Sequence, residues 1–207
     1  MRWWLFFALL LPFASNCQDA VNYFGGMDLH DGIYRDFQAF RDNRPTIPME
    51  ALRDAQGMAV SDIRRTSGKL LWQPDTGAQQ TVDLDRIWGF CQNDVVYIGT
   101  GNGFYRIGLM GSLAHLVVEE TYQDWNPYMY GYPYGSVTRT VLVQQLLDMT
   151  TGQYLPFNAS GMDKALLHDP VLSEEFRGLP KKQRNSFEVL FRFLRLYNDR
   201  NPLVFPE

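Results

Sequence analysis

Cysteine and clustered basic residues are both scarce in this chain, and each shortage excludes a class of protein. The 207 residues include only two cysteines, and the formal net charge is −4. Two cysteines are too few to build the disulfide framework of a small secreted scaffold. The stability of the fold must therefore come from the packing of its side chains. Lysine and arginine form no patch dense enough to attract a phosphate backbone, which argues against nucleic acid as a partner.

Long apolar runs are missing except at the N-terminus. There, Arg2 precedes twelve apolar residues, from Trp3 to Ala14, and polar residues follow. A membrane-spanning helix needs about 20 apolar residues, so this run is too short and predicts a signal peptide over residues 1–17. The residues favour simple cleavage before Gln18 but leave open a lipoprotein in which Cys17 is acylated, and such an anchor would be the only expected contact with a membrane.

Residues 18–207 are expected to form one globular domain, because this length supports one core but not two large ones. Cys91 is then the only remaining cysteine, so no intramolecular disulfide is expected although the protein is exported. We therefore expect an extracytoplasmic protein of a bacterial envelope, located in the periplasm, on the outer membrane surface or in the medium.

Short β-rich runs separated by turn residues dominate the middle of the chain. Asn93-Asp94 and Asn102-Gly103 are typical of tight hairpin turns, because these residues tolerate positive φ. The pattern predicts an antiparallel β-meander of about eight strands, and barrel-like and two-layer arrangements both remain open. The expected strands cover residues 70–73, 79–83, 87–92, 95–100, 104–109, 113–122, 137–149 and 153–157.

Helices are expected at both ends of this meander, which makes the fold class α+β. Apolar residues at near-helical spacing predict a short N-terminal helix over residues 34–43. The C-terminal part predicts helices over residues 162–168, with Ser160 as the cap, 171–178 and 182–198.

An aromatic segment follows the predicted strand 113–122 and has the most unusual composition in the chain. Its rings are interleaved with proline and glycine, and they are Trp125, Tyr128, Tyr130, Tyr132 and Tyr134. Rigid rings with polar tips suit sugar faces or protein partners. The sequence leaves two alternatives open: the rings bind a partner, or they fold back over an open end of the sheet.

Signatures of cofactor and metal chemistry are not recognisable. The glycines at 99, 101 and 103 lead into a predicted strand, whereas a dinucleotide-binding loop leads into a helix. Asp28, His30 and Asp31 lie close in sequence but have no visible partner ligand from another element. We therefore expect no cofactor and no metal site.

Two catalytic arrangements would each need particular side chains to come together. Cys91 could act as a thiol nucleophile if His115 lay beside it, although a buried cysteine is more often a small hydrophobic residue. A secreted hydrolase using Glu119 or Glu120 would need two carboxylates in one cleft. Neighbouring strand residues point to opposite faces, so these two cannot share a site without a bulge.

Four segments carry a resemblance to known sequences, and they are spread over most of the chain after residue 17. They begin at Asp31 (DGIYRDFQAF), Ile87 (IWGFC), Phe104 (FYRIG) and Tyr197 (YNDRNP). In these segments the chain resembles exported proteins of unknown function from Bacteroidetes-type bacteria. The resemblance implies export and an envelope setting, and it transfers no active site.

The sequence therefore favours a non-enzymatic envelope or secreted protein that binds a protein or glycan partner. A secreted hydrolase with an unrecognised acid/base site and a structural envelope component remain as alternatives.

Overall fold

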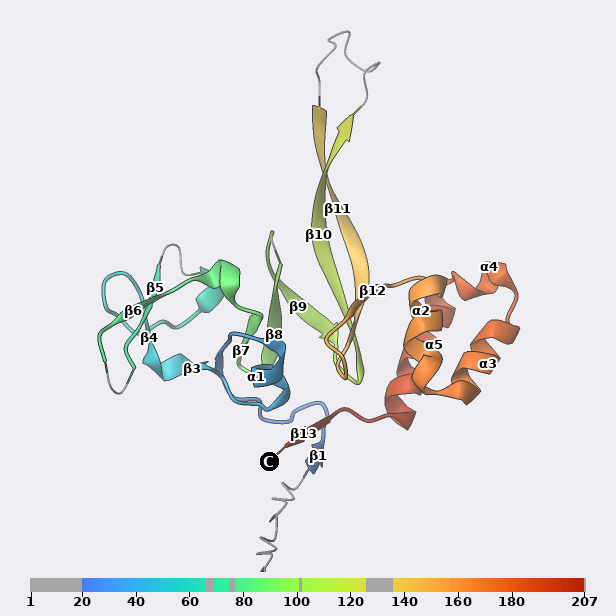
Figure 1. Cartoon of the computed structure of the whole chain (residues 1–207), viewed down its shortest axis with the longest axis horizontal. Coiled ribbons are helices and arrows are strands. Elements are labelled where there is room, and N and C mark those ends of the chain that lie inside the picture. The colour runs from blue at the N-terminus through green and yellow to red at the C-terminus, as the bar shows by residue number, and fades with distance from the viewer. Residues whose placement is uncertain (1–19, 66–68, 75–76, 101, 126–135, 207) are drawn as a thin grey trace, which may run out of the picture.

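An antiparallel sheet of eight strands forms the centre of the structure (Figure 1). The computed structural model describes residues 20–65, 69–74, 77–100, 102–125 and 136–206. The strand order is β12-β11-β10-β9-β8-β7-β2-β3. The bounds are β2 Gly32–Tyr34, β3 Ile47–Pro48, β7 Gly89–Gln92, β8 Val95–Thr100, β9 Gly103–Leu109, β10 Leu113–Trp125, β11 Ser136–Asp148 and β12 Tyr154–Pro156. The predicted α+β class with an antiparallel sheet is confirmed.

The β7–β8 hairpin shows why the sequence folds into consecutive antiparallel strands. Asn93 and Asp94 adopt positive φ angles of 51° and 58°, and Gln92 pairs with Val95 across them. Two such residues in succession make a tight turn whose twist matches that of the paired strands. The predicted two-residue hairpin is therefore confirmed.

The first two predicted strands belong to a separate sheet. They form β5 Leu70–Trp72 and β6 Gln80–Val82, which join β4 Leu52–Arg53 in the order β4-β5-β6. The central sheet itself is open, so the barrel-like alternative is wrong. Its two end strands are short and contain Pro48 and Pro156, which lack the N–H donor that a closing ladder would need.

The helix expected over residues 34–43 requires a correction. Tyr34 ends β2, and the helical part is limited to α1 Phe37–Arg41. Asn43 then takes a left-handed φ of 47°, which a helix cannot continue. The aromatic spacing that suggested a longer helix has another cause: Tyr34 in the strand and Phe40 in α1 pack edge to face, with ring centroids 5.5 Å apart.

The predicted C-terminal helices are confirmed as a group, with corrected boundaries. Asn158 starts the first helix by accepting a hydrogen bond from the Gly161 N–H (2.9 Å), so Ser160 is not the cap. The helix expected over 182–198 is two helices, interrupted at residues 185–186. The helices are α2 Ala159–Ala165, α3 Pro170–Gly178, α4 Lys181–Arg184 and α5 Phe187–Arg200.

Both faces of the central sheet are covered, because adjacent strand residues enter different apolar clusters. Cys91 and Leu147 belong to a first cluster, which also contains Phe40. Leu146 belongs to a second cluster, which the C-terminal helices complete. Phe90 belongs to a third, which the three-stranded sheet completes. In Figure 1 the helices and the three-stranded sheet accordingly lie on either side of the long β10–β11 hairpin.

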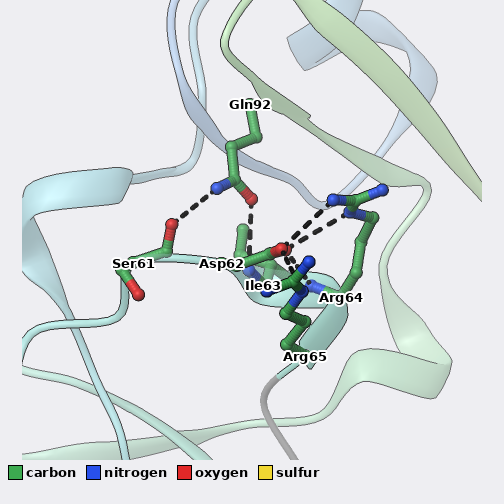
Figure 2. A network of polar contacts seen from close by, with 6 residues as sticks. All are labelled: Ser61, Asp62, Ile63, Arg64, Arg65 and Gln92. Atoms are coloured by element: carbon green, nitrogen blue, oxygen red, sulfur yellow. Dashed lines mark hydrogen bonds and ion pairs between the residues drawn. The ribbon is translucent and has the colours of Figure 1, made fainter.

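Polar side chains tie the outer parts to this sheet. Gln92 of β7 accepts a hydrogen bond from the Ile63 N–H (3.1 Å) and donates one to the Ser61 carbonyl (2.7 Å), as Figure 2 shows. These bonds hold the short 3₁₀ turn Ile63–Arg65 against the sheet. The ends of the described chain also meet, because β1 Ala20–Asn22 pairs with β13 Val204–Pro206.

Candidate interaction surface

The β10–β11 hairpin projects well beyond the sheet from which it starts. The two strands have thirteen residues each and pair over their whole length. β9 and β12 pair with the base of this hairpin, at residues 115–116 and 145–147. We call residues 119–125 and 136–142 the arm. At roughly 3.3 Å per residue, its length is about 20 Å, and Figure 1 shows it extending away from the other elements.

Side chains of the arm are exposed on both of its faces. Every side chain from Glu119 to Gln123 and from Thr138 to Leu142 is exposed, including Leu142 at 71% and Tyr122 at 45%. A strand with one face on a core would alternate between buried and exposed residues. The arm has no such face, so packing within the fold does not explain its sequence.

The β11 edge of the arm presents unpaired backbone groups. Alternate residues of an antiparallel strand direct their N–H and C=O to the same edge. The Phe157 N–H donates to the Gln144 carbonyl oxygen (3.0 Å), so the even-numbered residues of β11 face outward. Within the described chain, no strand pairs with this edge at Thr138, Thr140 or Leu142.

The β10 edge is partly capped. Asn102 Nδ2 donates to the Glu119 carbonyl oxygen (2.9 Å), so the odd-numbered residues of β10 face outward on this side. Thr121 follows Glu119 on the same edge. Its side chain lies against Thr140 across the hairpin, with the two hydroxyl oxygens 3.1 Å apart.

The predicted aromatic binding segment continues from the end of the arm. Trp125 is the last residue of β10 and pairs with Ser136. Tyr128, Tyr130, Tyr132 and Tyr134 lie outside the described residues, as does Cys17. Binding by these rings therefore stays a prediction.

The acidic residues around His30 tie two segments together. Asp31 Oδ2 accepts a hydrogen bond from the Asn93 N–H (3.0 Å), and Asp94 Oδ1 accepts one from the Leu29 N–H (3.0 Å). These two bonds clamp the chain before β2 to the β7–β8 turn. Across the described residues, no group of three or more histidine, cysteine, aspartate or glutamate side chains could hold a metal ion.

His30 nevertheless lines a hollow with several charged groups. Its ring Nδ1 lies 2.6 Å from the Asn43 carbonyl oxygen, which can only accept, so Nδ1 carries the proton and Nε2 of the neutral ring is an acceptor. The Asn43 side chain also accepts from the His30 N–H (2.9 Å), which fixes the residue further. The other lining residues are Asp31, Arg44, Pro45, Pro48 and Glu50.

The conceivable thiol pair does not form. Cys91 lies on β7 and His115 on β10, and the two intervening strands separate them by roughly 14 Å at about 4.8 Å per strand. Cys91 is buried in the first cluster, whereas His115 packs against Phe157 and Phe191 among the helices, with ring centroids 4.6 and 4.9 Å apart. Burial, together with Asp31, raises the pKa of the Cys91 thiol to about 12, so it stays protonated at neutral pH.

The two glutamates of the hydrolase alternative lie at the base of the arm on opposite faces. Glu119 stands opposite Leu142 and Glu120 opposite Val141, in unbroken register. Glu120 Oε1 accepts a hydrogen bond from Gln145 Nε2 (2.8 Å). Both residues border one hollow with Gln145 and Tyr154, but the alternation of the strand directs the two carboxylates to opposite faces.

Comparisons with family models, curated proteins and solved structures yield no match to this chain. Among the described residues, no helix is both long and apolar enough to cross a membrane. Inference about function therefore depends on the geometry of the chain itself.

Proposed function

We propose that the chain is a non-enzymatic binding protein that contacts a macromolecular partner through its arm. The observation that carries this proposal is the unpaired β11 edge from Thr138 to Leu142, on strands exposed on both faces. An open edge can receive an extended segment of a partner as an additional strand, with main-chain hydrogen bonds providing affinity. The partner is accordingly a protein, and we propose that the contact takes place outside the cytoplasm.

The aromatic segment gives this proposal a second contact. It connects the two strands of the arm, and Trp125 pairs with Ser136, two residues before Thr138 on β11. Replacing Trp125, Tyr130 and Tyr132 together should then weaken partner binding without changing the thermal stability of the fold. Unchanged binding with an intact fold would remove the rings from the proposal and leave the strand edge.

A photo-crosslinking amino acid placed at single positions tests the arm in cells that produce the protein. A probe at Thr140 on the open edge should give protein adducts, and a probe at the exposed Glu174 of α3 serves as the control. The adducts should disappear when Thr138→Pro removes an outward N–H from the same edge. Equal adduct yields at the two positions, or adducts that survive Thr138→Pro, would contradict the proposal.

A second candidate is a secreted hydrolase that uses the hollow beside His30. The observation that favours it is the fixed ring of His30, which lines the same hollow as Glu50 and Arg44. His30→Gln would abolish hydrolysis of a panel of ester and glycoside substrates if this hollow were catalytic. No turnover of the panel by the unaltered protein would leave the arm as the functional surface.

A further inference from the structure

The two end strands of the central sheet are short and contain proline, whereas the β11 edge is not protected in either way. β3 has two residues and ends in Pro48, and β12 has three and ends in Pro156. Short edge strands and proline are standard protections against pairing with another chain. Thr138–Leu142 contains neither proline nor lysine. This contrast marks the β11 edge as a surface where pairing is permitted.

The outward backbone groups of this edge are arranged to match a second copy of themselves. In an antiparallel pair, two facing residues exchange two backbone hydrogen bonds when the N–H and C=O of each residue point toward the other strand. A two-fold axis at Thr140 places Thr140 opposite its own copy and Thr138 opposite Leu142 of the second copy. Thr138, Thr140 and Leu142 of each copy then all form backbone hydrogen bonds with the second copy. An axis at Leu142 would instead need the Gln144 carbonyl, which already accepts from Phe157.

The charges of the arm are compatible with the same register. Arg139 is the only charged residue of Thr138–Leu142, and the axis at Thr140 places it opposite Val141 of the second copy. Two arginines therefore do not face each other. Within each hairpin, Glu120 stands opposite Val141. The charge nearest to Arg139 across the junction on that face is therefore the Glu120 carboxylate of the second copy, which has the opposite sign.

The side chains on the other face also suit this arrangement. Thr140 already lies against Thr121 within the hairpin, with 3.1 Å between the hydroxyl oxygens. The axis continues this row with the second copy's threonines, and β-branched residues favour such cross-strand neighbours. Leu142, at 71% exposure, gains a neighbour in Thr138 of the second copy.

We propose that two copies of this chain associate by antiparallel pairing of their β11 edges, which forms a four-stranded sheet β10-β11-β11-β10 with its two-fold axis at Thr140. This inference rests on the proposed function of the arm and names its partner. Pairing along five residues buries less than the roughly 1,200–2,000 Å² of a stable interface. The dimer is therefore reversible and depends on concentration. On the other edge of the arm, Asn102 already occupies the Glu119 carbonyl oxygen.

Sedimentation velocity on the purified chain over a concentration series tests the association. Thr140→Pro removes an outward N–H from both copies without breaking a bond to β10, and should weaken dimerisation at least about tenfold. Thr121→Pro is the matched control, since it makes the same change directly across the hairpin, on the β10 edge, and should leave dimerisation unchanged. Circular dichroism checks that both variants fold.

Charge and cysteine substitutions test the register independently of proline. Val141→Arg should weaken the dimer, because the new arginine would face Arg139 of the second copy. In a Cys17→Ser background, Thr140→Cys should oxidise to a covalent dimer, because facing residues of this type lie about 5.5 Å apart between Cα atoms. Thr121→Cys should not.

Each result has a definite meaning. A sedimentation coefficient that stays monomeric at every concentration, or equal effects of Thr140→Pro and Thr121→Pro, would overturn the dimer. If crosslinking at Thr140 then still yields adducts with other proteins, the proposed function stands and only the identity of the partner is wrong. If neither self-association nor other adducts occur, both proposals fail.

Discussion

The buried His115 should make the stability of this fold depend on pH near neutrality. Its side chain is 7% exposed, its Nε2 lies 3.0 Å from Gln144 Oε1, and Phe157 and Phe191 pack against its ring. Burial lowers the pKa of His115, and the hydrogen bond to Gln144 opposes this only partly. In the unfolded chain the pKa is about 6.5. At pH values between the two pKa values, the unfolded state therefore binds a proton that the folded state does not.

The free energy of unfolding keeps its full value above a pH of about 6.5. It falls as the pH drops toward the lower pKa of His115 in the folded state. One proton gives a slope of at most about 1.4 kcal/mol per pH unit. Urea unfolding followed by tryptophan fluorescence, repeated between pH of about 5 and 8, measures this slope.

A variant that cannot be protonated isolates the contribution of His115. His115→Gln should lower stability at every pH, because it loses ring contacts, and should flatten the slope between pH of about 5 and 6.5. His168→Gln at an exposed position is the control and should keep the slope of the unaltered chain. Identical slopes in the unaltered chain and His115→Gln would refute the reasoning.

Three further experiments test the packing. Phe40→Ala should destabilise the fold by about 3–5 kcal/mol in urea unfolding, because this fully buried ring contacts three other aromatic rings. In a Cys17→Ser background, Cys91 should react with a thiol reagent at pH of about 8 only as fast as the chain unfolds, and rapid labelling of the folded protein would contradict its burial. Gly89→Ala should cost about 1–3 kcal/mol, because its Cβ would collide with a backbone carbonyl of β8, whereas Gly178→Ala meets open space and should be neutral or slightly stabilising.

Local chemistry made the hairpins predictable, because the turn residues determine them. Asn93 and Asp94 need no distant contact to adopt positive φ, so the turn and both flanking strands follow from adjacent residues. The assignment of strands to sheets was not predictable in this way. Alternation indicates which faces a strand has but not which strand it pairs with, so β5 and β6 looked like a continuation of the meander.

The arm could not be predicted from the sequence for the same reason. The strand expected over residues 137–149 is β11, Ser136–Asp148, but a run such as Thr138–Leu142 has the composition of any strand inside a sheet. Whether a third strand covers it is decided by segments far away in sequence. The length of the hairpin was the available signal, since strands of thirteen residues greatly exceed the usual five or six.

The exposed strands of the arm are the part of the described chain that folding explains least. Ordering a residue costs roughly 1–2 kcal/mol of backbone entropy, and an isolated two-stranded hairpin is marginally stable at best. The base of the hairpin recovers that cost by burying Leu116 and Leu146 in two clusters, but the arm buries none of its described side chains. Local departures from the rules of folding occur mainly where function requires them. A partner strand would pair with the open backbone groups of Thr138–Leu142 and would cover exposed side chains of the arm. For this physical reason, Thr138–Leu142 is a better candidate for function than any hollow in the body of the fold.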